Sequence, residues 1–311
     1  MSEVLLINPV LPALDEQLSA LYTVHRYYQH ADKRGFLREV GPVITGVVTG
    51  GASGISNEVM DALPALRIIA INGIGTDAVD LPYARVRGIH VSTTPGVLTD
   101  DVADLAVGLL ISVCRGLCVG DEYVRGGQWG KSALPLARKF SGMKVGIVGL
   151  GRVGRAIATR AAAFGCPISY TDLRAIDDVP YRFVPGLRQL ADESDALILA
   201  ASADEAEGII NADVLDALGP DGYLINVARG KLVNEADLVQ ALATNRIAGA
   251  GLDVFVDEPN VPTELYSFTN VVLQPHRASA TVQTRVAMGE IVLASLAATF
   301  AGRRPETSVT P

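Results

Sequence analysis

Short apolar runs alternate with longer segments of helical periodicity along most of the chain. Within the first 98 residues, four runs rich in β-branched residues are separated by helix-like segments, and the runs cover residues 4–7, 44–48, 66–71 and 90–93. Alternation of strands and helices is typical of a parallel sheet whose strands are joined by helical crossovers. We therefore expect one α/β domain over residues 1–98.

A second alternating set follows in the remainder of the chain. Its apolar runs cover residues 144–148, 168–170, 196–199, 223–227, 248–253 and 271–273. Six strands with helices between them make a complete doubly wound sheet. The sequence thus predicts an α/β fold of two Rossmann-like or flavodoxin-like domains, each built on a parallel sheet.

Two helices outside these runs set the expected domain boundaries. Asp100 and Asp101 follow a Pro-Gly interruption and open a long apolar helix that reaches about residue 123. The last helix, about 282–300, follows the second sheet and needs another place to pack. Packing it on the first sheet gives one domain of residues 1–98 plus 283–311 and another of residues 99–282.

Composition narrows the class of protein. The 311 residues are 49% hydrophobic and 19% charged, as in a globular protein with sizeable cores. The 26 Lys and Arg residues against 34 Asp and Glu residues give a net charge of −8, which argues against a nucleic-acid partner. The three cysteines and four histidines lack zinc-type spacing, so neither a disulfide framework nor a metal site is expected.

The apolar segments also argue against a membrane partner. The N-terminus has no basic segment before its short apolar run, so a signal peptide is not expected and the cytoplasm is the predicted location. The most membrane-like stretch, residues 105–119, is interrupted by Arg115 and is shorter than a span requires. It is interpreted as a buried helix.

A glycine motif follows the first strand of the second set. Gly149, Gly151 and Gly154 have the spacing G-x-G-x-x-G at the opening of a helix, with Arg152 and Val153 between the last two glycines. In this position the first glycine allows a tight turn, the second allows pyrophosphate to approach, and the third allows close helix packing. The segment is therefore expected to bind a dinucleotide through residues 149–154.

The next strand ends at an acidic residue. Asp172 stands 23 residues after Gly149, where a carboxylate accepts hydrogen bonds from the ribose hydroxyls and repels a 2′-phosphate. This favours NAD(H). Arg174, two residues further on, leaves NADP(H) open, because its guanidinium could reach a 2′-phosphate.

Three further polar residues follow later strands of the same sheet. Arg229, Glu258 and His276 are expected at the carboxyl edge, where ligands collect in open α/β sheets. A guanidinium can bind a carboxylate, an imidazolium can protonate a carbonyl oxygen, and a carboxylate can keep that imidazolium charged. Together they form a constellation suited to the reduction of a 2-oxo acid.

These residues lie in segments that resemble a known family. The segments are Asn-Val-Ala-Arg-Gly at 226–230, Leu-Asp-Val-Phe-Val-Asp-Glu-Pro at 252–259, and Pro-His at 275–276 followed by Ser-Ala-Thr at 279–281. With the glycine motif, they resemble the D-isomer-specific 2-hydroxyacid dehydrogenase family over about residues 69–281, nearest to its glyoxylate, hydroxypyruvate and hydroxyphenylpyruvate reductases. The resemblance implies hydride transfer between NAD(P)H and a small 2-oxo acid to give the D-2-hydroxy acid. It also implies an active site in a cleft between a substrate-binding domain and the NAD(P)-binding domain.

The resemblance assigns roles to individual residues. His276 would be the general acid, Glu258 its charge partner, and Arg229 the group that binds the carboxylate and polarises the carbonyl. Asp253 matches the position that orients the nicotinamide carboxamide, although an acid that ends a strand could instead cap a turn. In the first domain, a Gly-x-Gly loop after a strand would bind the substrate carboxylate through the backbone N–H groups of Ile74 and Gly75.

Some positions depart from the family pattern. NADPH-preferring members tend to have Ser-Arg where Asp172 and Leu173 stand, which again favours NAD. Arg277 replaces a usually apolar residue and could meet a second polar group of a substrate or face solvent. The segment 201–208 lacks the usual Pro and Thr residues of a loop that flanks the cofactor.

Two other functions and a partner remain open at this point. A corepressor-like module that senses NAD without turnover could use the same fold, and an NAD-dependent hydrolase would need different groups at Glu258 and His276. The apolar helix 100–123 favours an isologous homodimer, as in the family, or burial within one subunit. In such a dimer Trp129 could reach the partner's substrate pocket.

Overall fold

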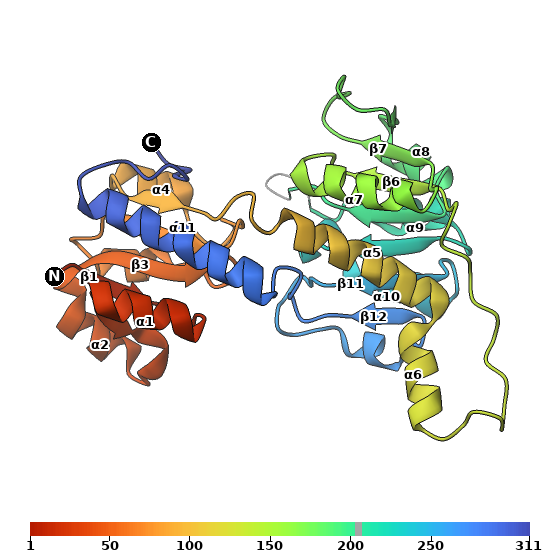
Figure 1. Ribbon diagram of the computed structural model, residues 1–311, viewed down its shortest axis with the longest axis horizontal. Helices are drawn as coiled ribbons and strands as arrows, with labels where there is room; N and C mark the ends of the chain where they lie inside the picture. The colour runs from red at the N-terminus through yellow and green to blue at the C-terminus, as the bar shows by residue number, and fades with distance from the viewer. Residues whose placement is uncertain (203–206) are drawn as a thin grey trace. The chain divides into compact units, whose positions relative to one another are not determined.

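The computed structural model describes residues 1–202 and 207–311, which form two compact units. The first unit consists of residues 1–98 and 279–311, and the second of residues 99–278. Each unit is described by itself below, with the elements labelled as in Figure 1. Both sheets are entirely parallel among the described residues, which confirms the predicted α/β class.

The first unit contains a sheet with the strand order β2-β1-β3-β4-β5, the flavodoxin-like arrangement. Its strands are β1 (Glu3–Leu6), β2 (Thr23–Arg26), β3 (Ile44–Gly50), β4 (Ile68–Asn72) and β5 (His90–Ser92). Its helices are α1 (Pro12–Leu21), α2 (Lys33–Val40), α3 (Asn57–Asp61), α4 (Leu81–Val86) and α11 (Val282–Phe300), with 3-10 turns η1 (Tyr27–Gln29) and η2 (Gly41–Val43).

Different helices cover the two faces of this sheet. α1 and α11 pack on one face, where Val292 and Leu296 of α11 join an apolar cluster with strand residues such as Leu6. Residues of α2, α3 and α4 join the cluster on the other face. The central strands are therefore buried on both sides, which explains their nearly continuous apolar sequence.

The second unit contains a sheet with the strand order β12-β11-β10-β9-β6-β7-β8, the doubly wound arrangement with one added strand. The strands are β6 (Val145–Val148), β7 (Ile168–Thr171), β8 (Arg182–Phe183), β9 (Ala196–Leu199), β10 (Tyr223–Asn226), β11 (Gly249–Leu252) and β12 (Val271–Leu273). The helices are α5 (Thr99–Arg115), α6 (Leu117–Arg125), α7 (Arg152–Ala163), α8 (Leu187–Asp192), α9 (Ala212–Leu218) and α10 (Glu235–Ala243), with 3-10 turns η3 (Gly230–Leu232) and η4 (Thr263–Ser267).

Two strands were not predicted from the sequence, one in each sheet. β2 has the sequence Thr-Val-His-Arg and lies at the edge of the first sheet, and β8 has only two residues at the edge of the second. Edge strands are covered on fewer sides than central ones, so their sequences need not be apolar. Hydrophobic pattern alone does not reveal them.

The predicted long helix of residues 100–123 is in fact two helices. α5 ends at Arg115, Gly116 adopts the left-handed φ of 61°, and α6 begins at Leu117 at an angle of 60° to α5. Glycine adopts this backbone conformation without the steric cost that a side chain would bring, so it marks the break. Within the described residues, no single helix is long and apolar enough to cross a membrane, and only this bent pair meets the criteria of length and composition jointly.

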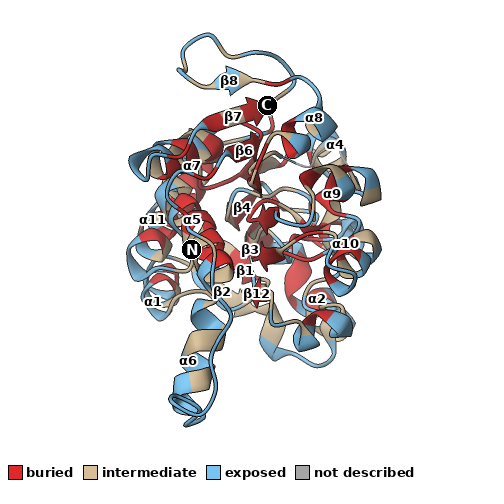
Figure 2. Ribbon diagram, turned by 90° about the vertical axis from the view of Figure 1, so that its right-hand side faces the viewer, coloured by how far each residue is buried: buried red, intermediate tan, exposed pale blue. Residues whose placement is uncertain are grey.

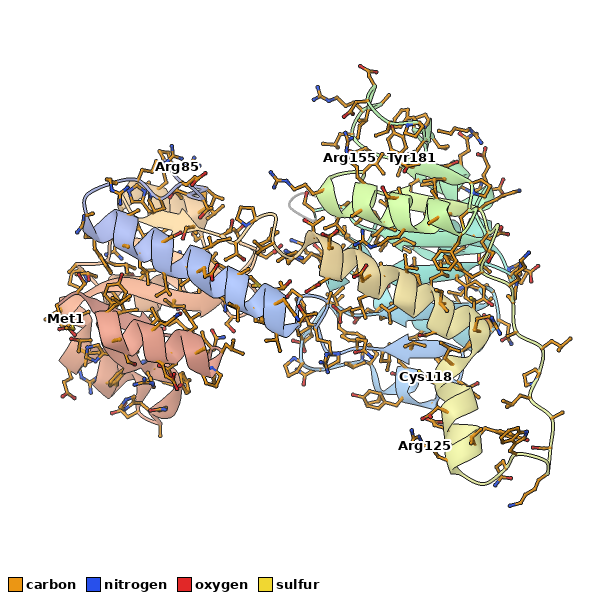
Figure 3. All side chains as sticks on the ribbon, viewed as in Figure 1. Met1, Arg85, Cys118, Arg125, Arg155 and Tyr181 are labelled. Atoms are coloured by element: carbon orange, nitrogen blue, oxygen red, sulfur yellow. The ribbon has the colours of Figure 1, made fainter. Side chains whose placement is uncertain are left out.

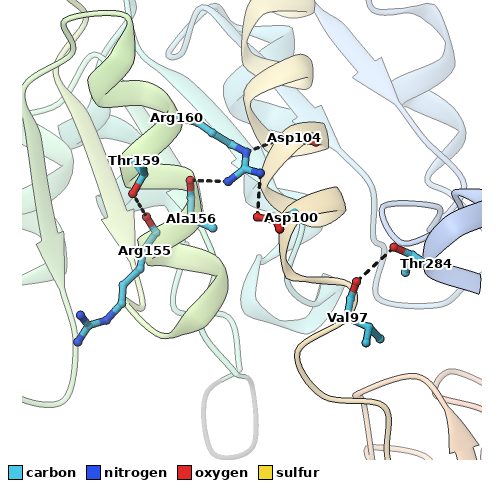
Figure 4. Close-up of polar contacts among 8 residues, drawn as sticks. All are labelled: Val97, Asp100, Asp104, Arg155, Ala156, Thr159, Arg160 and Thr284. Carbon is cyan, nitrogen blue, oxygen red and sulfur yellow. Dashed lines mark hydrogen bonds and ion pairs between the residues drawn. The ribbon is translucent and has the colours of Figure 1, made fainter. Parts of the chain in front are cut away.

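α5 and α6 differ in their surroundings. The apolar face of α5 packs against α7, β10 and β11, and an ion-pair cluster joins Arg160 of α7 to Asp100 and Asp104 of α5 (Figure 4). The apolar surface of α5 is thus satisfied within its own unit. α6 has no buried residue among those described, and Figure 2 shows it as an exposed projection.

Candidate active site

The turn from β6 into α7 carries the three glycines of the predicted dinucleotide motif. Gly149 has a φ of 87°, and a Cβ there would lie 2.6 Å from the Cα of Ala201. A Cβ on Gly154 would collide with the carbonyl oxygen of Gly149. A Cβ on Gly151 would meet none of the described atoms within 4 Å, so the backbone there faces open space. The turn has the steric features that fit a dinucleotide pyrophosphate.

The first turn of α7 adds the electrostatic part of this site. Gly151 is the N-cap and supplies no side-chain hydrogen bond, so the first N–H groups of the 12-residue helix are available to an anion. The side chain of Arg152 is exposed and that of Val153 is partly buried. A bound NAD(P) would therefore meet backbone donors and a helix N-terminus at residues 149–154.

Asp172 lies directly beside the glycine turn. Its Oδ2 accepts a hydrogen bond of 2.8 Å from the N–H of Leu150, and its Oδ1 accepts one of 2.7 Å from the N–H of Leu173. Each carboxylate oxygen can accept a further bond, so Asp172 can still bind ribose hydroxyls. Arg174 is exposed.

Asn226 shapes the loop that carries Arg229. Asn226 is buried at the end of β10, where its Oδ1 accepts from the N–H of Ala228 at 3.0 Å and its Nδ2 donates to the carbonyl of Arg229 at 2.9 Å. One guanidinium nitrogen of Arg229 donates to the carbonyl of Ala228 at 2.7 Å. The amide of Asn226 thus fixes the backbone on both sides of the loop and positions Arg229.

His276 and Glu258 form a direct pair. The Nδ1 of His276 lies 2.6 Å from the Oε2 of Glu258, and the Oε1 of Glu258 accepts from the N–H of Phe255 at 3.1 Å. Glu258 is partly buried, whereas His276 is exposed. The second ring nitrogen of His276, Nε2, is left available for another partner.

The electrostatics of Glu258 favour its charged form. Burial alone would raise the pKa of Glu258, but the hydrogen bonds from His276 and Phe255 and the positive charges of His276 and Arg229 outweigh it, so the pKa is lowered. Glu258 is therefore a carboxylate at neutral pH. A fixed negative charge at Nδ1 stabilises the imidazolium form of His276.

Asp253 fixes the backbone turn that carries His276. His276 has a φ of 48°, a left-handed conformation that is uncommon for a residue other than glycine. Its N–H donates to the carbonyl of Asp253 at 2.8 Å, while the carboxylate of Asp253 accepts from the N–H groups of Arg277 and Ala278 at 2.8 and 2.9 Å. Asp253 is completely buried, and burial raises its pKa despite these two bonds. Asp253 thus caps the turn after His276, the alternative that the sequence leaves open for this residue.

In the first unit, Ile74 and Gly75 lie on the loop that follows β4. In the described part of the chain, the N–H groups of Ile74 and Gly75 donate to no acceptor. The loop is held by a hydrogen bond of 2.8 Å from the N–H of Thr94 to the carbonyl of Gly73. It also packs closely against Gly51, where a Cβ would lie 3.2 Å from the carbonyl oxygen of Gly75. Two backbone donors are thus available at the carboxyl edge of the first sheet.

Arg277, the three cysteines and the segment 201–208 were also singled out in the sequence. Arg277 is exposed, and Cys118 on α6 is exposed while Cys114 and Cys166 are buried (Figure 3). No group of three or more His, Cys, Asp or Glu side chains in the described segments is placed to hold a metal ion. The departure noted for the segment 201–208 falls partly on residues 203–206, which lie outside the described residues.

These features define a nicotinamide-dependent dehydrogenase. The sheet is doubly wound, one of its strands ends in an open glycine turn, and an imidazole–carboxylate pair follows later strands. Residues 107–278 match the family described as D-isomer specific 2-hydroxyacid dehydrogenase, NAD binding domain. The chain belongs to the D-isomer-specific 2-hydroxyacid dehydrogenase family, and it is an NAD(P)-dependent oxidoreductase. The predicted family, enzyme class and nicotinamide cofactor are confirmed.

Similar proteins span nearly the whole chain. A 2-ketogluconate reductase of Gluconobacter oxydans is 45% identical, with 99% of this chain and 98% of that protein covered. A hydroxyphenylpyruvate reductase of Plectranthus scutellarioides is 44% identical, with 96% of each covered. The structure of an NADPH-dependent glyoxylate/hydroxypyruvate reductase from Sinorhizobium meliloti in complex with NADP and malonate has a TM-score of 0.90 at 40% identity, with 99% of this chain and 96% of that chain covered.

Proposed function

We propose that this enzyme reduces a small 2-oxo acid of the glyoxylate or hydroxypyruvate type to its D-2-hydroxy acid. The contact of 2.6 Å between His276 and Glu258 carries the proposal, because it holds the imidazole by Nδ1 and leaves Nε2 as a proton donor. The nicotinamide cofactor supplies the hydride when it is bound. His276 then donates a proton from Nε2 to the carbonyl oxygen as that oxygen gains negative charge.

The remaining residues have positioning and charge roles in this proposal. Arg229 binds the substrate carboxylate and polarises the carbonyl, and the N–H groups of Ile74 and Gly75 bind the same carboxylate. Asp253 orients the nicotinamide carboxamide in addition to clamping the turn after His276. Residues 1–98 with the C-terminal helix supply the substrate-binding domain, and the second unit supplies the NAD(P)-binding domain.

NAD(H) is the preferred cofactor in this proposal. Asp172 is fixed beside the glycine turn by its bond to Leu150, so its negative charge lies where the ribose of a bound cofactor would meet it. A 2′-phosphate at that place would be repelled. The Sinorhizobium meliloti relative is NADPH-dependent, and an NADPH preference in this enzyme would be explained by the exposed Arg174 instead.

A homodimer in the cytoplasm is the proposed state of the enzyme. The argument for the dimer rests on the projecting α6 and the segment after it, rather than on α5, whose apolar face is buried within its unit. Exposed apolar side chains gather there, namely Leu117, Val124, Trp129, Leu134 and Leu136. A surface of this kind is typical of a protein–protein interface.

A kinetic experiment tests the proposed reaction. Oxidation of NADH and of NADPH is followed by nicotinamide absorbance with glyoxylate, hydroxypyruvate, pyruvate and hydroxyphenylpyruvate, for the wild type and for His276→Asn. Asparagine is chosen because it tolerates the left-handed backbone at this position better than most residues, so the fold should be kept. We expect turnover with NADH that the substitution lowers by a factor of about 10² to 10⁴.

The alternative functions give different results in the same experiment. A corepressor-like module would bind NADH but show no turnover with any of the acids. A fall in activity with His276→Asn that matches a loss of folded protein would not support a catalytic role. Circular dichroism and NADH binding by the variant separate these outcomes.

A further inference from the structure

Arg285 is a partly buried cation in the first turn of α11. Among the described residues its guanidinium forms no hydrogen bond and no ion pair, and burial lowers its pKa. Most buried charges in proteins are paired, because an isolated charge loses hydration without compensation. Its guanidinium nitrogens are not among the fully buried atoms that lack a partner in the described residues, so a ligand can reach them.

The helix places Arg285 on its sheet-facing side. A rotation of roughly 100° per residue puts Arg285 within the arc of buried positions on α11, between Thr284 on one side and Gly289 on the other. Further along the same arc, Val292 and Leu296 pack on the sheet. Arg285 is therefore a charged residue on an otherwise uncharged, largely buried face of the helix.

The direction of α11 shows which edge of the sheet Arg285 approaches. Near the end of the helix, the carbonyl of Thr299 accepts a bond of 2.8 Å from Arg67, which directly precedes β4. Near its start, the hydroxyl of Thr284 donates to the carbonyl of Val97, beyond the end of β5, at 3.2 Å (Figure 4). α11 is thus antiparallel to the strands, and Arg285 lies at their carboxyl edge.

The same edge holds a second unpartnered polar group. Asn72 is the last residue of β4, and its buried Oδ1 has no hydrogen-bond partner in the described part of the chain. The N–H groups of Ile74 and Gly75 follow it within three residues. An amide oxygen needs a donor and a guanidinium needs an acceptor, and a hydroxyl group can serve both at once.

We propose that Arg285 and Asn72 bind the hydroxyl groups on the tail of the substrate, so that the enzyme prefers 2-oxo acids hydroxylated beyond the carbonyl carbon. This inference rests on the proposed reductase function. The carboxylate of the substrate already has the N–H groups of the loop and Arg229 as partners, so Arg285 is a specificity-determining residue for the other end. A carboxylate tail would satisfy Arg285 but would bring no donor for Asn72.

Substrates that differ only in their tails test the proposal. kcat/KM is measured for the wild type and for Arg285→Met with glyoxylate, which has no tail, pyruvate, which has a methyl tail, and hydroxypyruvate and 2-ketogluconate, which carry hydroxyls. Loss of a hydrogen bond to a charged group predicts a fall of about 10- to 100-fold with the hydroxylated acids, mainly through KM. Glyoxylate and pyruvate should change by less than about threefold.

Three further variants sharpen the test. Arg285→Lys keeps the charge and should restore part of the KM effect, and Asn72→Ala should affect the same substrates with a loss that is less than additive in the double variant. Arg85→Met is the matched control, since Arg85 is an exposed arginine on α4 of the same unit (Figure 3). It should leave all substrates unchanged.

The outcomes separate this inference from the proposed function. If the wild type reduces none of the acids, the proposed function fails and the inference fails with it. If the wild type is active but Arg285→Met lowers kcat/KM equally for all acids, Arg285 binds the common carboxylate and the inference alone is wrong. The inference is also wrong if Arg285→Met changes kcat/KM for none of the acids. Oxaloacetate, which has a carboxylate tail, is measured as a further probe, and a loss confined to it would overturn the inference as well.

Discussion

In the proposed reaction, the charge of Glu258 supports the proton donor His276. Glu258 has a pKa below its ordinary value of 4.5, so the pair with His276 contributes to stability above that value, and the contribution is lost as the pH falls through the lower folded value. Across the pH range in which the enzyme would work, Glu258 remains charged. Titration of Glu258 should therefore not change the activity in that range.

Glu258→Gln tests the proposed role of this carboxylate. The amide cannot stabilise an imidazolium, so we expect kcat/KM for reduction at neutral pH to fall about tenfold or more. The measurement is kcat/KM for both proteins at neutral pH, with NADH binding as the control for a correctly folded cofactor site. A variant as active as the wild type would contradict the proposed pairing.

Asp253 offers a second test at the level of single atoms. Asp253→Asn replaces one of the two acceptors for the N–H groups of Arg277 and Ala278 by a donor, which leaves one buried N–H without a partner. We expect the free energy of unfolding to fall by about 1–3 kcal/mol, as measured by urea denaturation. Asp177→Asn, at an exposed position of the same unit, is the control. Because burial raises the pKa of Asp253, its ionised form is destabilising, so the difference between the two proteins should grow as the pH falls.

The sequence predicts the candidate site residues but not the hydrogen bonds that connect them. Residue type and position after a strand were enough to select Arg229, Glu258 and His276. The sequence leaves open that Asp253 caps a turn. It does not show which backbone N–H groups Asp253 accepts from, because these lie on a separate loop that contains a left-handed residue. Arg285 was missed because a charged residue in the first turn of a helix usually faces solvent, and only the packing of α11 shows otherwise.

At the scale of elements, most strands and helices follow from hydrophobic periodicity. The final helix spans residues 282–300 as predicted, and the six main strands of the second sheet occur where the apolar runs predict them. The predictions failed at the edge strands β2 and β8, whose exposure removes the apolar pattern of a strand. They also failed at Gly116, where a single backbone angle ends one helix and begins another. The break at Gly116 separates an apolar helix that is buried in its own unit from one that is not.

α6 and the segment after it provide the test of the dimer. Val124 is 52% exposed and Leu136 is fully exposed at 101%. If these residues pack against a second copy, the double variant Val124→Lys and Leu136→Lys should convert a dimer to a monomer in analytical ultracentrifugation. Val86→Lys is the control, because Val86 lies in the first unit and is 87% exposed. It should leave the dimer mass measured by ultracentrifugation unchanged.

Trp129 gives the same segment a second readout. It is 80% exposed in this chain, so truncation to alanine should not lower stability. If it reaches the substrate pocket of a partner, Trp129→Ala should change the ratio of kcat/KM between hydroxyphenylpyruvate and glyoxylate. An unchanged ratio would remove Trp129 from the list of specificity residues.

At the scale of the whole molecule, the proposed function places the cofactor contacts in the second unit and part of the substrate contacts in the first. NADH is expected to contact residues 149–154 and Asp172 in the second unit, whereas the substrate carboxylate is expected at Ile74 and Gly75 in the first. Hydrogen exchange should therefore slow at the glycine turn with NADH alone. Adding an unreactive acid such as malonate should slow exchange at residues 73–75, and protection of both regions by NADH alone would contradict this division.

The position of Arg285 has a consequence for the engineering of this enzyme. A charged group on an otherwise uncharged, largely buried helix face loses part of its hydration without an ion-pair partner among the described residues, and this lowers the stability of the fold. Arg285→Met should therefore raise the free energy of unfolding by about 1 kcal/mol while it reduces discrimination between substrates. Selection for heat resistance alone would favour this replacement, and the resulting enzyme would be more durable and less selective.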